Sequence, residues 1–205
     1  MTLDSVLHSW TGIGLRHIPT GAGRGILDGT HAARSRRNRW NEAGTPTFYF
    51  ASDISVVVAE FGRHIRAELP GGDGERQARD VWRVPISLSR LIDFRDPAAA
   101  ASIGLPRVAD WIADVDRTQA TARYVRLHAD VQGLLVPSMG FLDDAARWNA
   151  VVYLDRIDPL VTFGTPVFVR RIILDAVGAT PMIASEAPDA IVAPALGTRP
   201  GQDLA

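Results

Sequence analysis

The chain has 205 residues, of which 46% are hydrophobic and 22% are charged, and its formal net charge is −1. This length and composition allow a globular domain with a sizeable core, and the near-zero charge excludes a global attraction to nucleic acid or to an anionic membrane. Cysteine is absent, which excludes disulfides, thiolate nucleophiles and cysteine-based metal sites.

The first part of the chain is expected to lead into a sheet. Residues 1–12 are expected to be a short lead-in without a signal-peptide pattern, and no apolar run reaches membrane-spanning length, so a cytoplasmic location is expected. Residues 13–18 predict a strand, ended by Pro19 and the glycines that follow. The run GAGRG at 21–25 departs from the G-x-G-x-x-G spacing, since Ile26 stands where the third glycine belongs, so a loop is predicted there.

A strand followed by a helix is predicted after the solvated basic run at 31–37. The aromatic segment 47–51 reads as a buried strand, with Ser52 as the N-cap of the helix that follows. Ile54, Val57, Val58, Phe61, Ile65 and Leu69 recur at helical spacing. Glu60 lies at the edge of this apolar stripe, so its carboxylate is expected to be half-buried and to point into a cleft.

The remaining elements complete a mixed sheet and its helices. A surface loop is predicted at 70–74, strands at 81–88, 91–94, 134–136 and 150–154, helices at 107–116 and 118–130, and a closing segment at 161–173. Pro85 is expected to place its strand at an edge or a bulge. Residues 1–175 are predicted to be the catalytic domain, and the Ala/Pro-rich residues 176–205 a tail that is flexible or bound to a partner.

Three familiar chemistries fit the sequence poorly. Ser138 lies in V-P-S-M-G rather than in the G-x-S-x-G of a serine hydrolase. The five histidines are scattered and H-E-x-x-H does not occur, so no metal is expected. A glycosidase-like carboxylate pair stays open, although no feature selects a second acid to join Glu60.

Six short segments in order resemble the RES domain, a family named for an Arg, a Glu and a Ser. They are LRH at 15–17, RWNEAG at 39–44, FYFAS at 48–52, AEF at 59–61, GLLVPS at 133–138 and WNAVVY at 148–153, and together they cover roughly residues 10–170. Two departures are His17, where many members carry Tyr, and Asn38, where many carry Gly. The resemblance implies an α+β fold with a split mixed sheet, similar to mono-ADP-ribosyltransferase toxins.

The resemblance also implies a function. It implies the toxin of a bacterial toxin–antitoxin pair that consumes NAD as its substrate, by hydrolysis or phosphorolysis. It also implies an Xre-like antitoxin that occludes the cleft, and DNA binding by this antitoxin stays open. An ADP-ribosyltransferase that modifies a protein is the alternative within enzymes. A nucleic-acid-binding or regulatory protein that uses the arginines at 34–39, and a fold without activity, are the alternatives from other classes. A homo-oligomer also stays open.

The candidate residues suit this chemistry. A carboxylate at Glu60 would stabilise positive charge that develops on a ribose, and arginine forks suit a pyrophosphate or a ribose edge. Tyr49 would stack on the nicotinamide ring. Catalytic roles are expected for Glu60, Arg16 and Ser138, and contacts with NAD for Arg16, Arg39, Tyr49, Ser138 and Asn149. Taken one at a time, each of these residues also suits an ordinary structural role.

Overall fold

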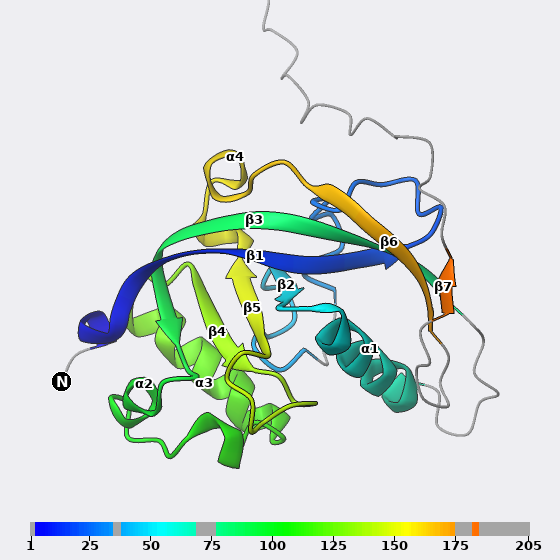
Figure 1. The fold of residues 1–205 in the computed structure, drawn as a ribbon. Coiled ribbons are helices and arrows are strands. Elements are labelled where there is room, and N and C mark those ends of the chain that lie inside the picture. Colours follow the sequence, from blue (N-terminus) through cyan, green and yellow to red (C-terminus); the bar gives the residue numbers. More distant parts are fainter. Residues whose placement is uncertain (1–2, 35–37, 69–76, 175–181, 185–205) are drawn as a thin grey trace, which may run out of the picture.

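A computed structural model describes residues 3–34, 38–68, 77–174 and 182–184. It has an α+β fold around one seven-stranded mixed sheet of order β1-β2-β5-β4-β3-β6-β7, in which β1 also pairs with β3 (Figure 1). The expected fold class is therefore confirmed. The predicted loop at 70–74 and nearly all of the predicted tail at 176–205 lie outside the described residues.

One half of the sheet is a long antiparallel ribbon. Strand β1 (Leu7–Pro19) pairs with β3 (Gln77–Asp93) along almost its whole length. Strand β6 (Val167–Leu174) pairs with the first half of β3, and β7 (Met182–Ala184) pairs with β6. The predicted lead-in is wrong, because a 3-10 turn, η1 (Leu3–Val6), leads directly into β1 at residue 7.

The other half of the sheet carries three shorter strands. Strand β5 (Trp148–Tyr153) lies between β2 (Thr47–Ala51) and β4 (Gly133–Pro137) and is antiparallel to both. This half joins the ribbon through three parallel pairs of β4 with the end of β3, and through one pair between Leu15 and Ala51. The strands predicted at 47–51, 134–136 and 150–154 are confirmed.

Helix α1 (Ile54–Glu68) packs against the ribbon. Val57 and Phe61 are buried with Leu15 and Val81 in a cluster shared with β1 and β3. The predicted N-cap is one residue off, because the carboxylate of Asp53, rather than the Ser52 hydroxyl, accepts a hydrogen bond from the amide of Val56 at 3.0 Å.

The remaining helical elements pack at different places, most of them on strands β4 and β5 and one against β3 (Figure 1). They are α2 (Pro97–Ala101), η2 (Val108–Asp110), α3 (Val115–His128), η3 (Leu154–Arg156) and α4 (Pro159–Thr162). The predicted helix at 107–116 is wrong, since Asp114 caps a new helix by accepting from the Arg117 amide. The segment at 161–173 begins as helix α4, so its strand starts only at residue 167.

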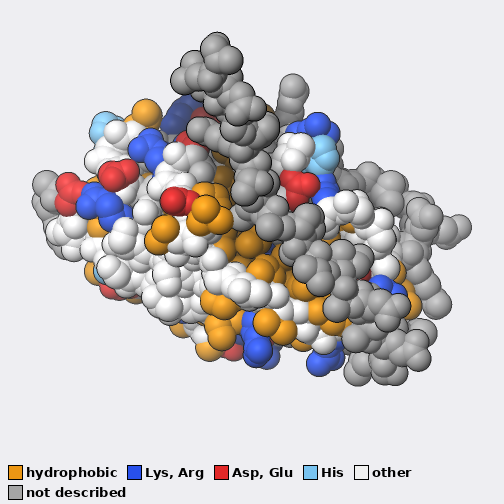
Figure 2. All heavy atoms as spheres, turned by 90° about the horizontal axis from the view of Figure 1, so that it is seen from above, with side chains coloured by type: hydrophobic (Ala, Val, Ile, Leu, Met, Phe, Trp, Pro, Cys, Tyr) orange, Lys and Arg blue, Asp and Glu red, His pale blue; other side chains and the backbone are white. Residues whose placement is uncertain are grey.

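The surface formed by α4 and β6 carries both apolar and charged side chains. Figure 2 shows apolar side chains gathered in a band there, with positive and negative side chains interspersed around it. The exposed large apolar side chains of these two elements are Leu160, Val161, Val167 and Val169. Within the described ranges, no helix combines the length and the apolar character needed to cross a membrane.

Candidate active site

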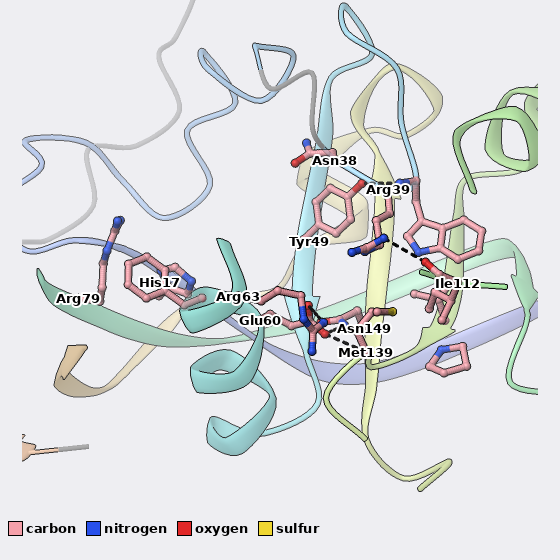
Figure 3. Close-up of a pocket in the computed structure, with 14 residues that line it drawn as sticks. His17, Asn38, Arg39, Tyr49, Glu60, Arg63, Arg79, Ile112, Met139 and Asn149 are labelled. Atoms are coloured by element: carbon pink, nitrogen blue, oxygen red, sulfur yellow. Dashed lines mark hydrogen bonds and ion pairs between the residues drawn. The ribbon is translucent and has the colours of Figure 1, made fainter. Parts of the chain in front are cut away.

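A cavity of about 410 Å³ opens between α1, the start of β5 and the segment that leads into β2 (Figure 3). A volume of this size is in the range of small-molecule and cofactor sites. Its lining residues are His17, Asn38, Arg39, Trp40, Tyr49, Glu60, Phe61, Arg63, Arg79, Ile112, Val136, Pro137, Met139 and Asn149.

The carboxylate of Glu60 is held by donors from three segments of the chain. Its Oε1 atom accepts hydrogen bonds from the Ser138 hydroxyl at 2.9 Å, the Met139 amide at 3.1 Å and the Asn149 side chain at 3.2 Å. Its Oε2 atom lies 3.3 Å from a guanidinium nitrogen of Arg63, one helical turn further on. The carboxylate is therefore fixed in one orientation while part of it, 31% of the side-chain surface, stays exposed.

The sheet and a close helix contact bring these donors to Glu60. Asn149 lies opposite Val136 in the β4–β5 register, so the end of β4 and the start of β5 meet beside the helix. Ser138 follows β4 directly and is fully buried, so it holds Glu60 from behind and does not line the pocket. The chain then turns at Gly140, where an added Cβ would lie only 2.8 Å from the Cβ of Ala59 in α1.

Arg39 and Tyr49 form the opposite wall of the pocket (Figure 3). Nη1 of Arg39 donates to the carbonyl oxygens of Ile112 at 3.1 Å and Ala113 at 2.9 Å, which fixes the guanidinium group in place. Burial lowers the pKa of Arg39, and the nearby Arg63 lowers it further, while Glu60 acts in the opposite direction.

Tyr49 is anchored by its hydroxyl group. The hydroxyl donates to the side chain of Asn41 at 2.6 Å and accepts from the Trp40 amide at 3.1 Å. Burial raises the pKa of Tyr49 well above its ordinary value, so the hydroxyl stays protonated and able to donate. Tyr49 also lines the pocket. Asn41 is a buried residue that the sequence did not single out for this role.

Arg16 does not line this pocket. Its guanidinium group lies 3.9 Å above the ring of Phe48 and donates to the carbonyl oxygen of Ile26. Because side chains alternate along a strand, Arg16 points away from α1 while its neighbour His17 points toward it. Burial, followed by repulsion from Arg24, lowers the pKa of Arg16 to about 10. The structure thus brings Arg39, Tyr49, Glu60 and Asn149 to the cavity, Ser138 behind Glu60, and Arg16 to the other face of β1.

Three further pocket residues were not assigned to the site from the sequence. Arg63 lies three residues after Glu60, a spacing that signals a neighbour on the same helix face. His17 and Arg79 meet at the ring of Phe61 and come from paired strands far apart in the chain. No local pattern in the sequence connects Arg79 with the other residues. Among the described residues no cluster of three or more acidic or histidine side chains is suited to a metal ion.

Comparisons with known proteins identify the family and the fold of this chain. The model of the RES domain family matches residues 16–174. In solved structures, a chain of the M. tuberculosis MbcT–MbcA toxin–antitoxin complex superposes with a TM-score of 0.60 at 23% sequence identity, over 82% of this chain and 89% of that chain. At this identity the likeness shows a shared fold. A search of curated proteins gives no match.

Proposed function

This chain belongs to the RES domain family, and from that premise we propose that it is the toxin of a toxin–antitoxin pair and cleaves the nicotinamide–ribose bond of NAD. The observation that carries the proposal is the fixed, partly exposed carboxylate of Glu60 in a pocket that also contains Arg39 and the Tyr49 ring. A carboxylate suits a sugar on which positive charge develops, a guanidinium group suits a phosphate or a ribose edge, and an aromatic ring suits a flat heterocycle.

The proposed reaction breaks the bond between the ribose C1′ atom and the ring nitrogen of nicotinamide. The bonding electron pair leaves with the ring, which departs neutral, and positive charge develops on the ribose. A carboxylate that is already oriented stabilises this charge without reorganising, which makes such groups effective in catalysis. Ser138 and Asn149 act on Glu60 rather than on the substrate, because their hydrogen bonds hold Oε1 in place.

The acceptor that takes the ribose defines the variants of this reaction. Attack by water or phosphate at C1′ gives hydrolysis or phosphorolysis, whereas attack by a protein nucleophile gives ADP-ribosylation. All three share the cleavage step and the residues around Glu60. A nucleic-acid-binding protein is less well supported, because Arg39 is directed into the pocket by two backbone carbonyls.

The toxin role includes a protein partner. The likeness to a chain of the MbcT–MbcA toxin–antitoxin complex supports an antitoxin that covers the pocket and blocks substrate entry. The exposed apolar side chains of α4 and β6 provide a second surface for protein contacts.

The decisive experiment measures NAD turnover by the purified chain, with and without phosphate, and identifies the products by NMR. Glu60→Gln should lower the rate of nicotinamide release at least 100-fold, because the amide keeps the size of the side chain but loses its charge. Glu42→Gln is the matched control, since Glu42 is an acid that pairs with Arg123 outside this pocket. If folded parent protein leaves NAD intact with water, phosphate and cell lysate supplied, the proposal fails.

A further inference from the structure

One end of the cavity is lined by a cluster of cationic and aromatic side chains that take no part in the cleavage step. Arg79 of β3 places its guanidinium carbon 4.5 Å from the centre of the Phe61 ring, and His17 of β1 meets the same ring edge-on at 5.2 Å and 87°. All three residues line the cavity. Figure 3 shows Arg79 and His17 together at one end, with Glu60 and Arg63 between them and Arg39.

Among the residues that the structure describes, no acid balances the charge of Arg79. In the described part of the chain Arg79 forms no ion pair, and its polar side-chain contact is an Nη2 donation to Gln77 at 2.6 Å. Its neighbour Asp80 is already paired with Arg171 at 2.8 Å. Burial lowers the pKa of Arg79, and repulsion from Arg24 lowers it further.

The geometry of Arg79 also leaves a donor unused. Its Nε atom is buried and has no hydrogen-bond partner among the described residues. The contacts with Phe61 and Gln77 thus leave this donor unsatisfied, which is unfavourable in a buried position. Arg79 lines the cavity, so a bound anion there would balance its charge, and the planar fork of arginine matches the oxygens of a phosphate.

We propose that Arg79, with His17 and Phe61, forms an anion-binding subsite for the pyrophosphate of the dinucleotide. This inference rests on the proposed function and deepens it. It places the phosphates at the β3 end of the cavity and leaves Arg39 and Tyr49 for the nicotinamide and its ribose, with Glu60 between the two ends. The pyrophosphate contact acts at a distance from the bond that breaks, so it contributes to binding rather than to the chemical step.

The test separates this subsite from the reaction. Arg79→Gln should raise KM for NAD at least tenfold while kcat changes less than threefold, and Arg79→Lys should recover part of the loss because it restores the charge without the fork. Arg83→Gln is the matched control, because Arg83 is an exposed arginine of the same strand that does not line the cavity, and it should leave both constants unchanged. Thermal unfolding of each variant verifies that the fold is intact.

Binding of ADP, measured by calorimetry on the parent chain and the same variants, gives a readout that is independent of turnover. ADP carries the pyrophosphate without nicotinamide, so its affinity should fall at least tenfold in Arg79→Gln and stay unchanged in Arg83→Gln. The subsite is overturned if ADP does not bind the parent chain, or if Arg79→Gln binds ADP and turns over NAD as the parent does. If NAD is not cleaved but ADP binding depends on Arg79, the proposed reaction is contradicted and the proposed subsite is supported.

Discussion

At the scale of single residues, the site depends on how the two oxygens of Glu60 are used. One oxygen accepts three hydrogen bonds from Ser138, Met139 and Asn149, and the other faces Arg63. This division fixes the carboxylate before any ligand arrives, which is the arrangement that stabilises developing charge most effectively. Ser138 was expected to contact the ligand; in this structure it is buried and donates to Glu60, and we propose that it positions this carboxylate.

Arg16 leads to a prediction at the same scale. Arg16→Gln should lower the free energy of unfolding by about 1.5–3 kcal/mol, the usual contribution of a hydrogen bond that involves a charged group, because the guanidinium group joins Ile26 to Phe48. NAD turnover per folded molecule should stay within threefold of the parent, since Arg16 lies on the opposite face of β1 from Glu60. Urea unfolding and steady-state kinetics measure the two effects separately.

Arg39→Gln is the comparison for Arg16→Gln, because Arg39 lines the cavity and its loss should change KM or kcat. A loss of turnover above tenfold in Arg16→Gln, with an unchanged unfolding midpoint, would contradict this prediction. Such a result would return Arg16 to the catalytic role that the RES resemblance implies for it.

At the scale of elements, the site depends on the contact between α1 and the turn after β4. Gly140 faces Ala59, the residue before Glu60, and an added Cβ would come within 2.8 Å of the Ala59 Cβ atom. Real Cβ atoms do not approach this closely, so the helix and the turn would have to move apart. The absence of a side chain at residue 140 therefore allows Ser138 and Met139 to reach Glu60.

The contact predicts that Gly140→Ala lowers kcat about tenfold or more, since small displacements of catalytic groups have large effects on rate. Ala59→Gly in the same chain removes the opposing methyl group, so the double variant should recover most of the lost activity. Steady-state kinetics of the single and double variants test this directly. Gly25→Ala is the control, because an added Cβ there meets nothing within 4 Å; a single and a double variant with equal activity would contradict the prediction.

The elements also show where sequence patterns are sufficient. The strand at 47–51 was predictable because Phe48, Phe50 and their neighbours are apolar on both faces, as a central strand requires. The single long strand β3 was predicted as two, at 81–88 and 91–94, with a break at residues 89–90. The strand continues because β1 pairs with it up to Leu88 and again at Leu91 and Ile92, across a register shift at residues 89–90, which is a tertiary effect that no local pattern contains.

At the scale of the whole molecule, the cavity is assembled from segments that only the sheet brings together. The sequence indicated Glu60, Arg39, Tyr49 and Asn149, because their segments resemble those of a family. It did not indicate which face of β1 turns toward helix α1, since the alternation of side chains along a strand defines two faces but does not say which one packs against the helix. Arg79 was missed for a related reason, because it reaches the cavity through the pairing of β3 with β1.

The whole fold also carries a pH dependence through two buried tyrosines. Tyr49 accepts from the Trp40 amide and Tyr153 donates to the Trp40 carbonyl at 3.2 Å, so both secure the segment that carries Arg39. Burial raises the pKa of each hydroxyl above its ordinary value. Above about pH 10, where tyrosines of the unfolded chain lose their protons, the folded chain therefore binds more protons than the unfolded chain.

The sign of the effect follows from proton linkage. Stability falls with rising pH wherever the folded state holds the extra protons, by up to about 1.4 kcal/mol per pH unit for each tyrosine that stays protonated. The stabilising contribution is thus complete below pH 10 and is lost as the pH rises through the folded-state pKa.

Urea unfolding between pH 8 and pH 11 should show a weaker decline of the free energy of unfolding in Tyr49→Phe than in the parent, because phenylalanine has no proton to lose. Tyr124→Phe, at an exposed position on α3, should decline as the parent does, and equal slopes in the parent and Tyr49→Phe would contradict the linkage. Since Arg16 and all other titrating groups are shared, the difference between these curves isolates the tyrosine that holds one wall of the cavity.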